Sequence, residues 1–375
     1  MKRKWIVIIG LVVVGLLLSA MGFLMGASRA IYWTSKGFSV TGGEISRITE
    51  PDLGYFKSIY IDVNFCDVEF ISSDKYGFDA CGYDMEWDWA LENEVLKIAH
   101  ARRIKYQIMN FGDSSTEKNY VKIYLPADSD LRTVEVKTRS ADASLGRFSA
   151  ESVDISNSFG NVNLYSVTSG EAHIGLNSGT ITGTDINARN LLKIDNSFGE
   201  VGLRTVTSGL LQIDLNSSDF AGSDINVRNL YHSNRFGKNS FHTVSAERFT
   251  ADCNSGDLEL DRCEFGDMVI TSRFTDITAR GITSSRADID VNSGDIRLDG
   301  ELTGETVIRS RFGGVRLNTS MEKSDYSYDI SVKFGSIKFD GDRLGDDTTI
   351  MGGSGSVHSL KITVSNGDVE VNFAK

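Results

Sequence analysis

A stretch of 24 residues occurs twice in the middle of this chain. The sequence TSGEAHIGLNSGTITGTDINARNL at Thr168–Leu191 returns as TSGLLQIDLNSSDFAGSDINVRNL at Thr207–Leu230, an offset of 39. Repeats at a fixed short period indicate stacked structural units that contact mainly their neighbours. Because 375 residues also exceed the usual size of one compact core, the repetition predicts an elongated array of such units.

A shorter period runs through both copies and beyond them, and glycine marks it. Successive marks, called turn positions below, are 19 or 20 residues apart, except for one step of 22 near the end. Glycine used at regular intervals is typical of turns in a repeat protein. The turn positions are Gly160, Gly179, Gly199, Gly237, Gly256, Gly294, Gly313, Gly335 and Gly355, with Ser218 and Thr275 filling two further places.

Apolar residues flank the turn positions at fixed distances. Isoleucine stands five places before most of them, and a large apolar residue stands two places after. No part of this region keeps a 3.6-residue period, so the pattern indicates short strands and no helix. The sequence predicts an all-β, elongated single-stranded β-solenoid with rungs of about 19–20 residues. The flanking residues are Ile155, Ile174, Ile194, Ile213, Ile270, Ile289, Ile308, Ile330 and Ile350 before, and Val162, Ile181, Val201, Phe220, Leu258, Ile277, Ile296, Val315, Ile337 and Val357 after.

Large and small residues alternate from one rung to the next. Phe and Ser alternate one place before the turn position, and a polar or large apolar residue alternates in the opposite order three places before it. Positions two apart share one strand face, so we expect both to face the core and keep its volume constant. A coil of about 19 residues places large over small, whereas a coil of about 39 stacks like on like; we favour the shorter coil. The alternating residues are Phe159, Phe198, Phe236, Phe274 and Phe312 with Ser178, Ser217, Ser255 and Ser293, and Asn157, Asn196, Asn234, Ser272 and Ser310 with Leu176, Leu215, Cys253 and Val291.

The start of the chain is apolar. Residues 5–27 carry no charge and would span about 34 Å as a helix, enough to cross a bilayer core of about 30 Å. The basic residues Lys2, Arg3 and Lys4 precede this segment and place residues 1–4 in the cytoplasm. A cleaved signal peptide is the alternative, but the apolar run continues past Ala20. We predict a single-pass cell-membrane protein with a signal-anchor helix and an extracytoplasmic carboxyl-terminal domain.

The remaining chain divides into three parts. Residues 28–52 are predicted to be an extracytoplasmic tether, 53–150 an N-terminal β-strand region, and 151–375 the β-solenoid repeats. Within 53–150 we expect strands at 59–65 and 68–70 about a turn at Cys66-Asp67, and further strands at 91–99 and 120–125. We also expect a loop at 110–119, with Trp87 and Trp89 in the core or on a sheet face.

Motifs before and within the repeats resemble a known family. These are V-x-x-x-D-V-x-F at Val63–Phe70, V-x-I-Y-L-P at Val121–Pro126, and N-S-G-D at Asn254–Asp257 and Asn292–Asp295. From about Ile59 onward the chain resembles the β-strand-repeat domains of unknown function whose bacterial members are called "putative adhesins". The resemblance implies a solenoid in the cell envelope, and supplies no catalytic residue or cofactor. The S-F-G rungs of this chain depart from the plainer S-G-D pattern, so no shared ligand is carried over.

Charge and cysteine content limit the chemistry. The net charge of −12 argues against nucleic-acid binding, which needs a basic patch. The pairs Cys66–Cys81 and Cys253–Cys263 lack zinc-ligand spacing, and we leave open whether they form disulfides or remain buried thiols, which is the simpler expectation.

Three aspartates, Asp257, Asp276 and Asp295, directly follow turn positions in consecutive rungs. Stacked carboxylates of this kind are either bridged by a divalent cation such as calcium or are solvated turn residues near Arg273 and Arg311; we favour the second interpretation and predict no metal site.

No motif of an enzyme is present: G-x-x-x-x-G-K-S/T, H-E-x-x-H and G-x-S-x-G are all absent from the sequence. We therefore predict a non-catalytic protein for envelope display and adhesin-like interaction, with a protein or glycan partner at the cell surface and the membrane contacted through residues 5–27. A regulatory or sensory accessory in envelope-stress signalling is the alternative, and a carbohydrate-active β-helix enzyme is a third hypothesis.

Overall fold

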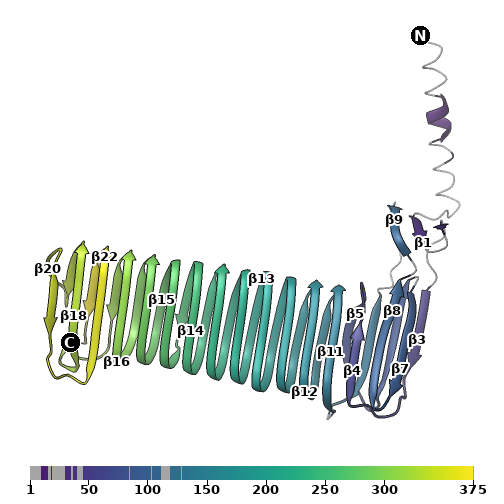
Figure 1. The fold of residues 1–375 in the computed structure, drawn as a ribbon, viewed down its shortest axis with the longest axis horizontal. Coiled ribbons are helices and arrows are strands. Elements are labelled where there is room, and N and C mark those ends of the chain that lie inside the picture. The colour runs from purple at the N-terminus through teal and green to yellow at the C-terminus, as the bar shows by residue number, and fades with distance from the viewer. Residues whose placement is uncertain are drawn as a thin grey trace, which may run out of the picture.

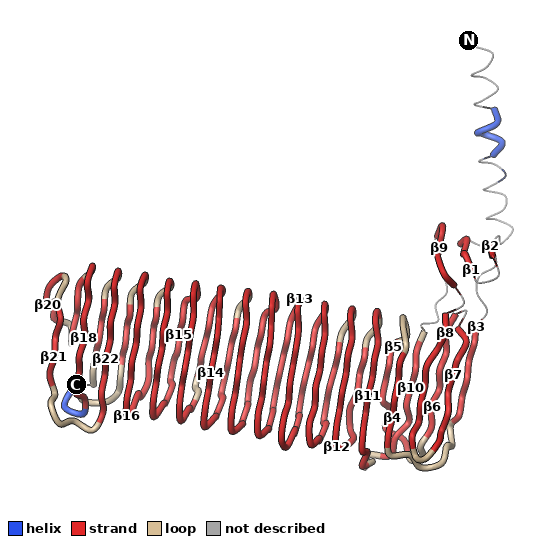
Figure 2. Tube along the Cα trace, viewed as in Figure 1, coloured by secondary structure: helices blue, strands red, loops and turns tan. Residues whose placement is uncertain are grey.

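The chain forms a long rod of stacked strands (Figure 1). The computed structural model describes residues 10–15, 18, 30–34, 37–39, 45–83, 85–102, 104–110, 119–127 and 129–374. Nearly all of these residues lie in strands, and Figure 2 shows the strands running side by side across the rod. This confirms the predicted all-β fold and its solenoid form.

The strands have very unequal lengths, because the ladder continues around some corners of a coil without interruption. In the longest, β13, 75 residues run through several coils. The strands are β1 (Ala30–Thr34), β2 (Gly37–Ser39), β3 (Ile45–Glu50), β4 (Ser58–Asp62), β5 (Asp67–Ser73), β6 (Gly77–Tyr83), β7 (Met85–Glu92), β8 (Val95–Arg102), β9 (Ile104–Asn110), β10 (Tyr120–Pro126), β11 (Asp130–Ser140), β12 (Ala143–Phe159), β13 (Val162–Phe236), β14 (Asn239–Asp261), β15 (Glu264–Ser293), β16 (Ile296–Phe312), β17 (Val315–Asn318), β18 (Tyr326–Phe334), β19 (Ser336–Phe339), β20 (Asp342–Asp346), β21 (Thr349–Gly352), β22 (His358–Asn366) and β23 (Val369–Asn372), with a 3₁₀ turn at Lys323–Asp325.

The coil is one rung long. β12 pairs with β13 in parallel, with Ile155 opposite Ile174 and Phe159 opposite Ser178, a step of 19 residues. The same step joins β13 to β14 and β14 to β15. The shorter of the two predicted coils is therefore the correct one, and each large residue lies over a small one.

The core is a single column along the rod. The isoleucines five places before the turn positions stack in register and are buried, as are the apolar residues two places after, with the exceptions of Ile350 and Val357 near the carboxyl-terminal end. Burying one such side chain contributes about 1.5–3 kcal/mol. Because each coil contributes several of them to the same continuous cluster, neighbouring coils support one another along the rod.

Glycine is required at most turn positions because the coils approach closely there. Gly179 has φ +141°, and a Cβ on it would lie 1.9 Å from the carbonyl oxygen of Gly160 in the preceding coil. Gly256 has φ +122° and would meet the carbonyl of Gly237 at 2.0 Å. Ser218 and Thr275 lack a positive φ and instead bury their side chains.

The carboxyl-terminal end has an unexpected order of coils. β22 pairs in parallel with β16 on one side and with β18 on the other, so the last segment of the chain lies inside the second-to-last one. The step of 22 residues between Gly313 and Gly335 therefore joins coils that are not neighbours. The true turn position of the intervening coil is Gly367, so the assignment of Gly355 was wrong, and Val357 is 85% exposed.

Antiparallel strands close both ends of the rod. At the carboxyl-terminal end β20 and β21 fold back on β19 and β18. At the other end β6 runs antiparallel to β10, and β7 and β8 form a hairpin. Such strands cover the ladder edges that a repeat stack leaves exposed.

Three local predictions for the N-terminal part need correction or completion. The expected strand at 91–99 is the hairpin of β7 and β8, which turns at Asn93 and Glu94 with φ of +51° and +63°. Part of the expected tether is folded, since β3 pairs with β6. The predicted loop at 110–119 lies mostly outside the described residues, and Trp87 and Trp89 pack partly buried against the core.

The predicted anchor at 5–27 lies mostly outside the described residues. Residues 10–15 and 18 are helical. Among the residues that the structure describes, no helix reaches the length and apolarity needed to cross a membrane. The anchor stays a prediction from the sequence.

Candidate functional site: an exposed corner of the solenoid

The phenylalanines one place before the turn positions face solvent. This corrects the expectation that they fill the core: the alternation of inward and outward side chains along the strand stops at the last residue before the corner, and the phenylalanine there is exposed whether glycine or, as after Phe274, threonine follows it. The position three places before the turn does face the core, as expected. The exposed side chains, called the phenylalanine row below, are Phe159 (54% exposed), Phe198 (50%), Phe236 (52%), Phe274 (58%), Phe312 (54%) and Phe334 (56%).

The row occupies every second coil. Ser255 lies between Phe236 and Phe274 in the ladder, and Asn366 lies between Phe312 and Phe334. Since adjacent strands are about 4.8 Å apart, successive rings follow one another at about 9.6 Å, with a small or polar side chain between them. Phe334 belongs to the row because a later segment of the chain, with Asn366, lies between it and Phe312. Its distance from Phe312 in the sequence therefore did not reveal its place in the row.

Beneath the row, buried asparagines hold the corner together. The side-chain amide of Asn157 donates to the carbonyl of Ala141 at 2.8 Å, and that of Asn234 donates to the carbonyl of Ser218 at 2.8 Å. Asn196 donates in the same way to Gly179 at 3.2 Å. Gly179 and Ser218 are turn positions of the preceding coil, and Ala141 stands at the equivalent place one coil before Gly160. The alternating Asn column therefore has a structural role that volume arguments from sequence did not identify.

On one side of the row, carboxylates accept backbone N–H groups from the next coil. Asp276 accepts from the amide of Asp295 at 2.8 Å, and Asp295 accepts from the amide of Gly314 at 2.9 Å. Asp219 and Asp368 make equivalent bonds to Lys238 and Ser336. These carboxylates cap turn amides, which supports the predicted turn role.

This geometry gives Asp276 and Asp295 a role other than a cation bridge, because each carboxylate already accepts a backbone amide. Within the described part of the chain, no group of three or more His, Cys, Asp or Glu side chains is arranged to hold a metal ion. The neutralising partner of Asp295 is Arg297, at 2.7 Å, rather than the expected Arg273 or Arg311.

On the other side of the row, cations precede the last four phenylalanines. Arg235, Arg273, Arg311 and Lys333 are all exposed. Among the described residues none of the four has an ion-pair partner, although Lys333 lies 5.4 Å from the ring centroid of Phe334 and Arg311 approaches Asn292. The first two phenylalanines follow Ser158 and Ser197 instead. The residues that precede the phenylalanines are thus basic in the carboxyl-terminal part of the row and uncharged in its amino-terminal part.

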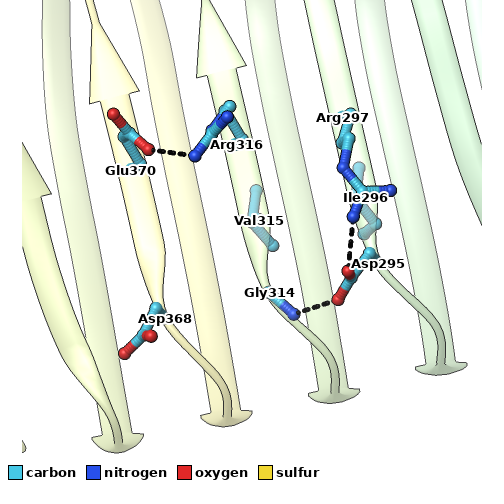
Figure 3. Close-up of a pocket in the computed structure, with 8 residues that line it drawn as sticks. All are labelled: Asp295, Ile296, Arg297, Gly314, Val315, Arg316, Asp368 and Glu370. Atoms are coloured by element: carbon cyan, nitrogen blue, oxygen red, sulfur yellow. Dashed lines mark hydrogen bonds and ion pairs between the residues drawn. The ribbon is translucent and has the colours of Figure 1, made fainter.

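A shallow hollow lies near the carboxyl-terminal end of this corner (Figure 3). The aspartates that accept amides beside the row form an acidic column. The hollow lies where Gly314 takes the place of an aspartate in this column, between Asp295 and Asp368, so that no side chain fills the position. Figure 3 shows Arg316 paired with Glu370, at 2.7 Å, and Arg297 paired with Asp295. Two of the three carboxylates that line the hollow are therefore paired with arginine, and the third, Asp368, accepts hydrogen bonds from Ser336.

A buried carboxylate at the amino-terminal end of the rod, that of Asp79, also has its hydrogen-bond partners within the protein. Asp79 is buried and accepts hydrogen bonds from Arg47, Thr49 and Tyr120 at 2.8–3.1 Å. Burial alone would raise the pKa of Asp79, but these hydrogen bonds outweigh it and hold the pKa below its usual value. Burial and the bond to Asp79 raise the pKa of Tyr120 to about 12. These side chains join β3, β6 and β10 and offer no open position to a substrate.

A polar coil interrupts the core in the middle of the rod. His232 stands where other coils have isoleucine, and its Nε2 contacts the amide oxygen of Asn239 at 2.7 Å. The ring lies among Phe220 and Phe241 at centroid distances of 5.2 Å. Burial lowers the pKa of His232 to about 4, against the opposing effect of the Asn239 contact. The histidine is neutral at physiological pH and structural.

All four cysteines are buried as thiols, which agrees with the simpler of the two expectations. Burial raises the pKa of Cys253 to about 12 and that of Cys263 to about 11. Thiols of this kind are poor nucleophiles. Cys253 and Cys263 are therefore not reactive thiolates, and the unusual feature of the described residues is the exposed corner.

The fold and the corner together define a capped, parallel β-solenoid with an exposed aromatic edge. The chain belongs to the Toastrack DUF4097 family, whose model matches residues 56–224 and again residues 208–372. The two matches nearly cover the rod from end to end, in agreement with the family that the sequence motifs resemble.

Several solved structures are similar to this chain. One is a "putative cell adhesion protein" from Clostridium sporogenes (7% identity, 88% of this chain and 99% of that chain, TM-score 0.16). A second is a "putative adhesin" from Parabacteroides distasonis (11%, 88% and 97%, TM-score 0.26). A third, from the same organism, is a "putative lipid binding protein" (16%, 70% and 96%, TM-score 0.24). At these TM-scores the likenesses carry no argument about function. Among curated proteins no relative matches the chain.

Proposed function

We propose that this protein is a membrane-anchored, extracytoplasmic display protein that binds a partner at the cell surface without catalysing a reaction. The single observation that supports binding is the phenylalanine row. Six aromatic side chains, each at least half exposed, lie at one corner of the rod. Large exposed apolar groups arranged together are typical of interaction sites.

The shape of the surface supports binding of a macromolecule rather than a small substrate. Small-molecule sites are concave and enclose most of their ligand. The row instead lies on a corner of the rod, and both arginines of the nearby hollow are already paired with carboxylates. A long, shallow, repeated surface fits an extended partner.

Location is tested on intact cells that produce the full chain with a tag after Lys375. A protease added outside should remove the tag if residues 5–27 anchor the chain and the rod lies outside. A tag that is protected until the cells are lysed would contradict the proposal. Replacing residues 5–27 with an unrelated membrane-spanning helix should leave binding unchanged, since the segment is proposed to act only as an anchor.

Binding is tested with the same cells. Adhesion to surfaces or to other cells should fall when Phe236 and Phe274 are both changed to Ser, the residue that alternate coils carry at this place. Tyr231→Ser is the matched control, because Tyr231 is 40% exposed on the same coil as Phe236 but lies outside the row. Equal adhesion by the wild type and the double variant would remove the row from the proposed function.

A further inference from the structure

We infer that the phenylalanine row is an interface between two copies of this chain, which lie side by side in antiparallel orientation with their rings interdigitated. The inference deepens the proposed function, on which it rests for the role of the contact, by naming the partner as a second copy. The row is made of six exposed rings separated by small or polar residues.

The spacing of the rings supports interdigitation. Rings of one copy are about 9.6 Å apart, twice the strand separation of about 4.8 Å. A ring from a second copy placed midway would lie about 4.8 Å from each neighbour along the rod, within the range of about 4.5–7 Å that aromatic pairs prefer. The gap between two rings therefore admits one ring.

The residues between the rings leave the space that this arrangement needs. Ser178, Ser217, Ser255 and Ser293 stand in the intervening coils, and Asn366 occupies the last gap. A ring of one copy thus faces a serine of the other along most of the row. Large and small residues alternate on one surface, so the surface is complementary to itself.

The exposed area is sufficient for a specific dimer. With about 200 Å² per phenylalanine side chain and about half of each exposed, six rings offer about 600 Å² per copy. Two copies would bury about 1,200 Å² through the rings alone, which reaches the lower limit of stable interfaces at about 1,200–2,000 Å². The backbone and flanking side chains of the corner add to this area.

The two ends of the row differ in charge, and an antiparallel arrangement brings unlike ends together. Arg235, Arg273, Arg311 and Lys333 flank the carboxyl-terminal part of the row, whereas Ser158 and Ser197 flank the amino-terminal part. A two-fold axis perpendicular to the rods places Arg311 and Lys333 of each copy beside the uncharged part of the other, whereas Arg235 and Arg273 of both copies lie near the axis. The same axis permits the half-period offset that interdigitation needs, and it closes the assembly at two copies.

The middle of the row gives a direct test of orientation. Ser255 stands in the sixth of the eleven coils that the row spans, between Phe236 and Phe274. In either interdigitated register it lies within about one coil, or about 4.8 Å along the rod, of its own symmetry mate. Ser178, near the amino-terminal end of the row, lies about 34–43 Å along the rod from its mate.

Crosslinking of single-cysteine additions follows from this geometry. The full chain carrying Ser255→Cys or Ser178→Cys is purified in detergent and treated with a short bis-maleimide; the native thiols are buried and serve as an internal background control. We expect Ser255→Cys to give crosslinked dimer and Ser178→Cys to give at least tenfold less. Equal crosslinking at both positions would overturn the antiparallel arrangement, and crosslinking at neither would overturn the interface.

Sedimentation equilibrium of the full chain in detergent, matched in density to the solvent, tests the rings themselves. The wild type and Tyr231→Ser should be dimers with the same dissociation constant, and Phe236→Ser/Phe274→Ser should raise that constant at least tenfold. Circular dichroism and thermal melting establish that the variants are folded. A monomeric wild type, or a double variant that dimerises as tightly as the wild type, would overturn the inference.

The two proposals fail separately. A monomeric chain whose row variants still lose adhesion to cells lacking the protein would reject self-association and keep the binding function. A dimer whose tag is protected from outside protease would keep the interface and reject surface display.

Discussion

At one corner of the rod, the buried side chains on the inner side and the exposed side chains on the outer side both repeat every second coil, but they have different roles. On the inner side, three places before the turn, Asn234 is buried and donates to the carbonyl of the preceding coil. On the outer side, one place before the turn, Phe236 is 52% exposed. The alternation inside is explained by hydrogen bonding within the rod. The alternation outside has no such internal explanation, so it points to a partner.

The largest effect on both sides of the corner is expected from a change in the turn that separates them. Gly256→Ala adds a Cβ at a positive φ, 2.0 Å from the carbonyl oxygen of Gly237. Strain and overpacking together should reduce the free energy of unfolding by roughly 4 kcal/mol. Urea unfolding followed by circular dichroism measures this loss. Gly202→Ala is the control, because nothing lies within 4 Å of its Cβ position, and it should cost less than about 1 kcal/mol.

Acid should act on the inner side through His232. The pKa of buried His232 is about 4, whereas an unfolded histidine has a pKa of about 6.5. Above pH 6.5 neither state is charged, and below it the unfolded state takes up the proton first. Stability should therefore fall as the pH drops from about 6.5 to about 4, by about 3 kcal/mol in total.

The measurement is the thermal midpoint between pH 7 and pH 4. His232→Gln cannot titrate, so its midpoint should fall less across this window than that of the wild type. Parallel curves for the two proteins would show that His232 is not the group responsible.

Removing the inner hydrogen bond should have a smaller effect. Asn234→Leu matches the leucine that alternate coils carry at this place, but it leaves the carbonyl of Ser218 without its amide donor and removes a contact to Asn239. We expect a loss of about 2 kcal/mol in the free energy of unfolding, measured in urea. Leu215→Asn, the reverse change in the neighbouring coil, should also destabilise; a neutral effect of both changes would mean that the alternation is not structural.

The acidic column beside the row should contribute less again. Asp276→Ala removes one acceptor of an exposed backbone amide at Asp295, with an expected cost of about 1 kcal/mol. The thermal midpoint of the wild type should be the same with added calcium and after chelation, since the carboxylates are bound to amides. A rise of the midpoint with calcium that Asp276→Ala abolishes would restore the cation hypothesis.

The outer side should contribute least to stability. Phe236→Ser exposes no core and breaks no hydrogen bond that the structure describes, so the thermal midpoint of the monomer in detergent should correspond to a change within about 0.5 kcal/mol. Asn234→Leu, two residues away, is the internal comparison. A large loss for Phe236→Ser would show that the ring packs within the rod after all.

Sequence reasoning predicted the solenoid and its coil length because glycine turns and buried isoleucines repeat at fixed spacing, and that spacing is a direct record of the coil. It failed where the chain leaves simple alternation. Phe159 was assigned to the core because strand periodicity was extended one residue too far, into the corner. The outward direction of the ring follows from the geometry of the corner, which the structure shows as an exposed fraction of 54% and which residue spacing does not encode.

The ends of the rod were also beyond reach from sequence, for a different reason. Gly355 fitted the 20-residue spacing, and nothing in the local pattern indicates that β22 crosses to the inner side of β18. The hairpin turn at Asn93-Glu94 carries no glycine and was missed. The aspartates after the turn positions were predicted to be turn residues. That they accept backbone amides of the next coil could not be predicted, because it depends on how one coil stacks on the next.

The crossed order of the last coils affects how the rod can be completed. Residues Tyr326–Phe339 form the outermost parallel strands, but their inner neighbours are the later residues His358–Asn372. During synthesis the outer turn therefore emerges before the strand it must rest on, and that end of the stack can close only after the final segment has threaded into place. In the folded protein, the carboxyl-terminal segment cannot unfold first and alone at the end of the stack, since β22 is paired with a strand on each side.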